Sequence, residues 1–328
     1  MRLFLVSFAA LILLSGSAAF YVVRWNDAPL ALTEPVVVVL EAGEPFSKFA
    51  ARISASGYLT HPRLWSRLAR LRGLARQAKA GEYALQPGDT PERLLQRIVR
   101  GEVVTYEVRL LEGWTVMQVL LALQENQVLE HELVGANVTT LLEALGLPGG
   151  HAEGLFYPDT YQFVRGSSDR DILRRAYDRM QMVLEGAWDQ RASGLPYRTP
   201  YEALIVASLV EKETGRDEDR EHISQVFVSR LNANMRLQTD PSVIYGLGER
   251  FDGNLKRVHL RESTPYNTYV IRGLPPTPIA LPGGKSIDAA LHPGPGDYLY
   301  FVSRGDGTSQ FSRSHAEHLA AVRKYQLK

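Results

Sequence analysis

Residues 199–215 read TPYEALIVASLVEKETG, and this stretch decides the fold. Thr199 is a residue type that caps helices, and Pro200 suits the first helical position because its missing N–H would be unpaired there anyway. The following residues, 203–210, are apolar on nearly every face of a helix apart from one serine. A helix that is apolar all round is buried. The sequence therefore predicts a buried helix with two glutamates at its C-terminal end.

The two glutamates, Glu211 and Glu213, place negative charge at the negative end of the helix dipole. That position raises the pKa of a carboxyl group, as does partial burial. A carboxylic acid that keeps its proton near neutral pH is what a general acid needs. The alternative is that both are solvated or paired with Lys212, Arg216 or Arg220. Because Glu211 and Glu213 lie about 200° apart around a helix, they face different sides, and helix geometry does not choose between them.

Several other segments combine aromatic rings with amides and hydroxyls. Sugar-binding sites have this composition, because aromatic faces pack on pyranose rings and polar groups fix the ring substituents. Asp240, followed by proline, is interpreted as a helix N-cap. The alternative for each aromatic residue is packing in the core. The candidate substrate-binding residues are Tyr157, Gln238, Thr239, Tyr245, Tyr266 and Asn267.

The composition excludes several other chemistries. The chain has 328 residues and no cysteine, which rules out disulfides, thiolate catalysis and cysteine-bound metals. Its formal net charge of +1 is not that of a nucleic-acid-binding protein. There is no GxSxG, P-loop or HExxH motif, and the eight histidines lack metal-ligand spacing. We expect no cofactor, no metal and no nucleic-acid partner, with His315 and His318 as surface residues of a terminal helix.

The N-terminal segment predicts a membrane anchor. Residues 3–23 carry no charge and would span about 31 Å as a helix, close to the thickness of the bilayer core. Arg2 and Arg24 flank the run. The alternative is a cleaved signal peptide ending near residues 17–19, which are small. We expect an uncleaved transmembrane helix within residues 1–26, and either interpretation sends the remaining chain across the membrane.

A weak internal repeat follows a short linker. Stretches beginning at 36, 83 and 104 each have the pattern of a strand, a glycine turn and a helix. The first two resemble a LysM-like module, a class that binds N-acetylated glycans, and we assign this subdomain to 35–105. From 106 to 328 the chain is expected to form one larger mixed domain, which makes the fold class α+β. Helices are predicted at 116–129, 139–145, 171–185, 201–213, 220–231 and 315–325, and strands at 298–303 and 309–311.

Taken together, the motifs resemble the endolytic murein transglycosylase family (MltG, YceG-like) over nearly the whole chain. The motifs that carry the resemblance are Glu211-Lys212-Glu213-Thr214, Leu237-Gln238-Thr239-Asp240-Pro241 with Ile244-Tyr245-Gly246, Tyr266-Asn267-Thr268-Tyr269 with Gly273-Leu274-Pro275-Pro276, Glu153-Gly154 with Pro158-Asp159-Thr160-Tyr161, and Tyr298-Leu299-Tyr300-Phe301-Val302.

The resemblance implies a function. The family places its catalytic glutamate at the second Glu of its motif, which is Glu213 here. It implies endolytic cleavage of the bond between N-acetylmuramic acid and N-acetylglucosamine, with 1,6-anhydro ends as products and nascent glycan strands limited in length. Expected partners are peptidoglycan strands, membrane lipid around the N-terminal helix, and peptidoglycan synthases. The expected location is the inner membrane, with the catalytic domain in the periplasm. The alternatives are a peptidoglycan hydrolase and a non-catalytic wall-binding scaffold.

Overall fold

A computed structural model describes residues 2–327, with the side chains of 2–6 and 9–11 outside the described part. The chain divides into two compact units. The first contains the residues up to 106 together with 162–166, and the second contains 107–161 and the residues from 167 onward. Helices and strands are mixed in both, which agrees with the predicted α+β class.

The first unit is built from two strand–turn–helix segments around one core. β1 (Val36–Leu40) pairs antiparallel with β2 (Gly81–Leu85), with Val36 opposite Leu85 and Leu40 opposite Gly81. Phe49 and Trp65 pack beneath this pair and are fully buried. The helices of the unit are α1 (Arg2–Asn26), α2 (Phe46–Ala55), α3 (Pro62–Leu71), the 3-10 turn η1 (Leu74–Arg76) and α4 (Pro91–Arg100).

The predicted anchor coincides with α1, and part of it falls on side chains outside the described residues. Among the residues that are described, no helix is both long enough and apolar enough to cross a membrane. Near its end α1 contacts the rest of its unit, because Trp25 Nε1 donates to Thr60 Oγ1 at 2.8 Å and Asn26 donates to Glu92 at 2.9 Å.

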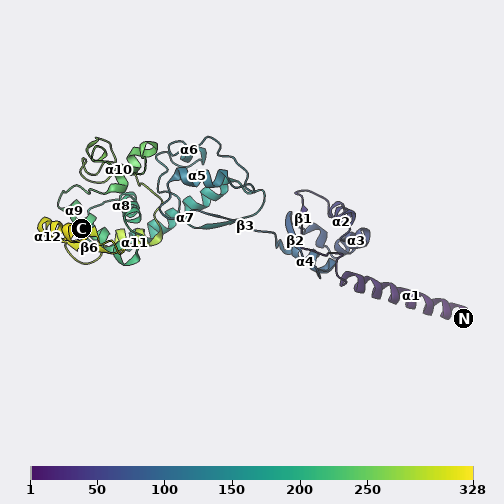
Figure 1. Ribbon diagram of the computed structural model, residues 1–328. Coiled ribbons are helices and arrows are strands. Elements are labelled where there is room, and N and C mark those ends of the chain that lie inside the picture. Colours follow the sequence, from purple (N-terminus) through teal and green to yellow (C-terminus); the bar gives the residue numbers. More distant parts are fainter. Residues whose placement is uncertain (1, 328) are drawn as a thin grey trace. The chain divides into compact units, whose positions relative to one another are not determined.

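The second unit is organised around α8 (Pro200–Glu213). Thr199 caps it by accepting a hydrogen bond from Glu202 N, and residues 203–210 are all buried. Within this unit α8 lies among α9, α10 and α11 (Figure 1). The one polar residue of the buried stretch, Ser208, donates to Ile205 O at 2.7 Å and accepts from Ile279 N at 3.0 Å. The Ser208 hydroxyl therefore has a partner both as donor and as acceptor, and it joins the loop that contains Ile279 to α8.

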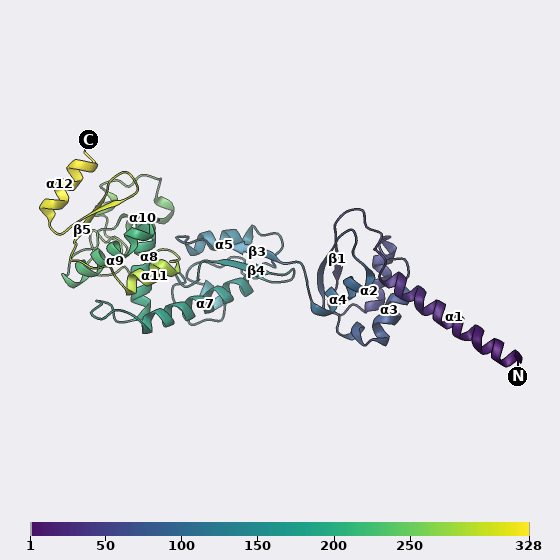
Figure 2. The ribbon, with the colours of Figure 1, turned by 90° about the horizontal axis from the view of Figure 1, so that it is seen from below.

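The remaining helices and strands of the chain include most of the predicted helices. They are β3 (Tyr106–Arg109), α5 (Val116–Gln124), α6 (Leu141–Ala144), β4 (Thr160–Phe163), α7 (Asp169–Asp189), α9 (Asp217–Asn232), α10 (Asp240–Leu247), the 3-10 turns η2 (Gly248–Arg250) and η3 (His259–Arg261), α11 (Gly284–Leu291), β5 (Tyr300–Ser303), β6 (Ser309–Ser312) and α12 (His315–Tyr325). β5 and β6 form the predicted hairpin, with Tyr300 opposite Ser312. Figure 2 shows α12 lying beside β5.

Two local predictions were wrong, and one helix was missed. The helix expected to reach residue 129 ends at Gln124, because the Asn126 side chain accepts from the N–H groups of Val128 and Leu129 and forms a turn. α11 was not predicted at all, since its sequence begins with glycines after a proline. Asp240 is not a cap: α10 begins at Asp240 itself, and its carboxylate accepts from Tyr269 Oη at 2.6 Å.

Candidate active site at the end of helix α8

The C-terminal turn of α8 sends its two glutamates to different places. Glu211 accepts hydrogen bonds from Gly283 N at 3.0 Å and Ser286 Oγ at 2.7 Å, both at the start of α11, and lies 3.8 Å from Arg220. A carboxylate at a helix N-terminus satisfies N–H groups that have no partner within the helix. Glu211 is therefore committed to holding α11 against α8.

Glu213, the last residue of α8, instead lines an open hollow of about 580 Å³ within the second unit. The walls come from α9, the loop before α10, the β5–β6 hairpin and α12. The lining is mostly polar or aromatic and includes Arg230, Gln238, Asp240, Tyr269, Tyr300, Ser303, Ser309, His315 and His318. A concave surface with convergent polar groups and aromatic rings around one carboxyl is typical of a site that binds carbohydrate.

A short hydroxyl network fixes the Glu213 carboxyl. Thr239 Oγ1 donates to Glu213 Oε1. The Thr239 backbone is held in turn, because its N–H donates to Thr268 Oγ1 at 3.0 Å and its carbonyl accepts from Ser242 Oγ at 2.8 Å. Ser242 and Thr268 also share a hydrogen bond of 2.9 Å, and both are fully buried. One oxygen of Glu213 is thus occupied and positioned by protein.

The environment raises the pKa of Glu213 to about 7. The largest cause is burial, which disfavours the ionised form. The hydrogen bond from Thr239 lowers the pKa, the negative charge of Asp240 raises it, and the positive charge of Arg230 lowers it. Burial and Asp240 prevail, so the protonated form of Glu213 persists to a much higher pH than in an exposed glutamate.

Arg230 and Gln238 shape the same wall. The Arg230 side chain is buried and donates to Leu237 O and to Leu299 O, each at 2.7 Å, so it joins the loop before α10 to the residue that precedes β5. Gln238 has a positive φ of 52°, a conformation that costs free energy for a residue other than glycine. Its N–H donates to Thr268 O at 3.2 Å, which holds the backbone there. Its side chain lines the hollow, where Oε1 accepts from Arg230 at 3.4 Å.

The predicted site residues separate into two groups. Gln238 lines the hollow and Thr239 bonds to Glu213. Four others do not line this hollow, and a role for them in binding substrate stays a prediction. Tyr157 packs under Arg179, Tyr245 donates to Glu153 at 3.1 Å, Tyr266 bonds to Thr277 at 2.9 Å, and the buried Asn267 donates to two backbone carbonyls, His259 O and Glu262 O.

Glu153 is a second carboxyl group whose pKa is raised to about 7, and the largest cause is again burial. It is almost fully enclosed and accepts from Val116 N at 3.0 Å and from the Tyr245 hydroxyl. These contacts join α5 to α10, the helix that follows Thr239. Glu153 does not line the hollow around Glu213, so its contacts indicate a supporting position.

Comparison with known proteins identifies the family. The YceG-like family matches residues 38–324 of the chain. This chain belongs to the YceG-like family. It is 28% identical over 308 residues to the endolytic murein transglycosylase of Bacillus subtilis (strain 168), a match that covers 88% of this chain and 84% of that protein. The family predicted from the motifs is therefore confirmed.

Two further relatives extend the comparison. The endolytic murein transglycosylase of Streptococcus pneumoniae serotype 2 is 26% identical over 318 residues, which cover 86% of this YceG-like chain and 57% of that protein. A crystal structure of a YceG-like protein from Listeria monocytogenes superposes with a TM-score of 0.56 at 27% identity. It covers 88% of this chain and 99% of the Listeria chain.

Several residues that line the hollow around Glu213 are not predicted as site residues from the sequence. Arg230 lies within the predicted helix 220–231, and Tyr300 belongs to the strand motif Tyr298–Val302, but neither pattern indicates a place in the site. The sequence predicts His315 and His318 as surface residues; His315 is exposed, whereas His318 is partly buried because it stacks on Tyr300 with ring centroids 5.1 Å apart. The one sequence signal for His318 is that the predicted helix 315–325 follows the predicted hairpin directly, which places the helix close to the strands.

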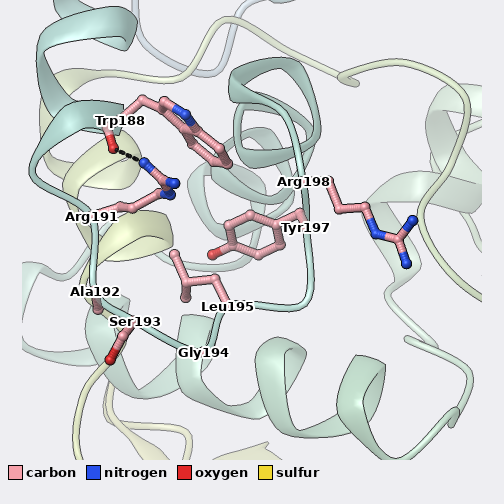
Figure 3. Close-up of a pocket in the computed structure, with 8 residues that line it drawn as sticks. All are labelled: Trp188, Arg191, Ala192, Ser193, Gly194, Leu195, Tyr197 and Arg198. Carbon is pink, nitrogen blue, oxygen red and sulfur yellow. Dashed lines mark hydrogen bonds between the residues drawn. The ribbon is translucent and has the colours of Figure 1, made fainter.

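A second hollow of about 420 Å³ lies at the end of α7 (Figure 3). Its lining consists of Trp188, Arg191, Ala192, Ser193, Gly194, Leu195, Tyr197 and Arg198. Arg191 stacks on the Trp188 ring at 4.1 Å and donates to Trp188 O, while Arg198 points away from both. No acidic residue is among the described residues that line this second hollow. Among the residues that the structure describes, no group of three or more histidines, cysteines or acids is arranged to hold a metal ion.

Replacing Glu213 with glutamine tests the burial of its carboxyl. The pKa of Glu213 in the folded protein is above the ordinary glutamate value of 4.5, so ionisation disfavours the folded state progressively as pH rises from about 4.5 to about 7. Glutamine keeps the acceptor for Thr239 and removes the charge. We expect Glu213→Gln to be about 1–3 kcal/mol more stable than the parent at pH 8 and nearly equal to it at pH 4.5, as measured by urea unfolding. Equal stability at both pH values would contradict the burial of this carboxyl.

Proposed function

We propose that this protein is a lytic transglycosylase that cleaves the glycan strands of peptidoglycan, with Glu213 as its acid and base. The observation that carries the proposal is the Glu213 carboxyl, held by Thr239 in an open polar hollow with its pKa raised to about 7. The relatives named endolytic murein transglycosylase supply the substrate class and the type of bond.

The reaction needs one carboxyl group that works twice. Protonated Glu213 donates its proton to the glycosidic oxygen between N-acetylmuramic acid and N-acetylglucosamine, and the bond from that oxygen to the muramyl anomeric carbon breaks. The ionised Glu213 then takes the proton of the muramyl C6 hydroxyl. That oxygen bonds to the anomeric carbon and closes a 1,6-anhydro ring, so Glu213 ends protonated and no water is consumed. A pKa near the working pH suits a group that must both give and accept a proton.

The surrounding groups support this sequence of steps. Thr239 occupies Oε1 of Glu213 as a donor, which leaves Oε2 to carry the proton toward substrate. Asp240 favours the protonated form, and Arg230 favours the ionised form that exists while the anomeric carbon is electron-poor. Opposing charges around one carboxyl keep its pKa between the extremes that would disable either step.

Hydrolysis on the same glycan is the competing reaction, and one observation favours it. Ordinary glycosidases use two carboxylates, and Asp240 lines the hollow together with Glu213. In our proposal Asp240 does not activate water, because its carboxylate accepts a hydrogen bond from Tyr269 Oη and acts through its charge on Glu213. The two reactions differ in their products.

We further propose that 35–105 is a LysM-like module that binds glycan and that cleavage falls within nascent strands, which limits their length beside peptidoglycan synthases. The support is the strand–turn–helix repeat, seen as β1 with α2 and β2 with α4, and the word endolytic in the relatives' names. We also propose that residues 1–26 anchor the chain in the inner membrane with the remaining residues in the periplasm, which rests on the uncharged run at 3–23.

Product analysis tests the reaction. Purified protein incubated with peptidoglycan should release fragments that end in 1,6-anhydromuramic acid, as measured by mass spectrometry. Glu213→Gln should lower the rate at least about a hundredfold, since general acid–base catalysis contributes on that order. Glu211→Gln, the matched control at the neighbouring glutamate, should keep most of the activity because its amide oxygen can still accept from α11.

Each other outcome has a meaning. Hydrated reducing ends would assign the protein to hydrolysis, and no cleavage would leave a wall-binding scaffold. If Glu211→Gln lost activity and Glu213→Gln kept it, the assignment of the acid would be wrong.

Membrane fractionation tests the location. The full chain should stay with the membrane after alkaline carbonate extraction, and a variant lacking 2–24 should not. An extractable full chain would contradict an uncleaved anchor, and a mature chain that begins after residue 19 would instead support a cleaved signal peptide.

A further inference from the structure

Three rings and a guanidinium form a connected group on one wall of the hollow. The Arg230 guanidinium lies 5.2 Å above the Tyr300 ring, and His318 stacks on the same ring at 5.1 Å with an interplanar angle of 20°. His315, one turn earlier on α12, has its ring 5.8 Å from Tyr300. Stacking on a ring that is itself fixed by a buried arginine holds the plane of the His318 imidazole.

The His318 side chain is held in place by stacking, yet no hydrogen bond to it is found among the described residues. Its Nδ1 is enclosed and has no partner among the described residues, and no hydrogen bond to Nε2 is found among them either. Buried polar atoms in folded proteins usually have a partner, and the lack of one at Nδ1 means that no bond from the described residues fixes the tautomer of the ring. Because Nδ1 is the enclosed nitrogen and the residue lines the hollow, Nε2 is the nitrogen that a ligand can reach.

The charges around His318 indicate which ligand group it suits. Burial is the largest cause that lowers the pKa of His318, and the positive charge of Arg230 and the neighbouring His315 lower it further. The imidazole is therefore neutral at neutral pH. A neutral imidazole with no bond fixing its tautomer can donate or accept through Nε2. Such a group matches an uncharged polar substituent better than a carboxylate.

We propose that His318 of α12 is a substrate-positioning residue, whose Nε2 hydrogen-bonds an uncharged acetamido or hydroxyl group of the sugar bound beside Glu213. This inference rests on the proposed function for its glycan substrate. It assigns to the C-terminal helix a part of the binding surface: α12 closes the side of the hollow formed by β5, with Tyr300 as the platform between Arg230 and His318.

Binding measured without turnover tests the proposal. In the Glu213→Gln background, calorimetry with soluble uncross-linked glycan strands gives a dissociation constant. Adding His318→Phe keeps a ring to stack on Tyr300 and removes both nitrogens. We expect the dissociation constant to rise about tenfold, the equivalent of one ordinary hydrogen bond. His131→Phe, at an exposed histidine outside the hollow, is the matched control and should leave the dissociation constant unchanged.

Kinetics in the parent background give the second readout. His318→Phe should raise KM about tenfold and change kcat by less than about threefold, with a thermal midpoint close to that of the parent.

Binding should not tighten when the pH falls from 7.5 to 6, because the proposed contact is uncharged. Strands from which the N-acetyl groups have been removed should show no effect of His318→Phe if the partner is acetamido, and the full effect if it is a hydroxyl.

The outcomes separate the two proposals. If the parent protein cleaves glycan and Glu213→Gln binds it, but His318→Phe binds equally well, the role of His318 is wrong and the proposed function stands. Tightening at low pH would also overturn it, since a cationic histidine bound to a carboxylate would then be indicated. If Glu213→Gln does not bind glycan at all, the proposed function itself fails.

Discussion

The hydrogen bond from the Thr239 hydroxyl to the Glu213 carboxyl is the constraint on which the rest of the site depends. It joins the end of the buried helix α8 to the start of α10, and it selects the oxygen of Glu213 that remains available to a ligand. Neither partner is free to move, because α8 is buried from 203 to 210 and Thr239 is held by Ser242 and Thr268. A rigid core therefore fixes the position of a carboxyl group of the kind that acid–base catalysis requires.

The neighbouring glutamate shows how the same helix end serves both structure and chemistry. Glu211 turns toward α11, where its carboxylate meets an N–H group, a hydroxyl and the buried Arg220. Glu213 turns toward the hollow, where burial raises its pKa. Two carboxylates that are two residues apart on a helix point in different directions, so one can stabilise the packing of α8 while the other stays available. The proposed single-carboxylate mechanism fits this division.

Local sequence patterns predicted much of the fold and a smaller part of the site. The apolar run of α8 and its Thr199 cap identified the central helix, because burial on all faces leaves a distinct pattern. α11 was missed because its start is stabilised by Glu211 from another helix, a long-range contact that no local pattern records. The choice of Glu213 rested on family resemblance, since the helix wheel left both glutamates open. His318 was misjudged because its burial comes from stacking on Tyr300 in a different element.

The central claim is that Glu213 keeps its proton near neutral pH in a site shaped by Thr239. Carbon-13 NMR of glutamate-labelled protein measures this directly, with Glu213→Gln identifying the resonance. We expect the Glu213 carboxyl to titrate with a midpoint near pH 7. In Thr239→Val the midpoint should move to higher pH, because the hydrogen bond that favours the ionised form is lost. A Glu213 midpoint below pH 5 in the parent protein, unmoved by Thr239→Val, would contradict the account.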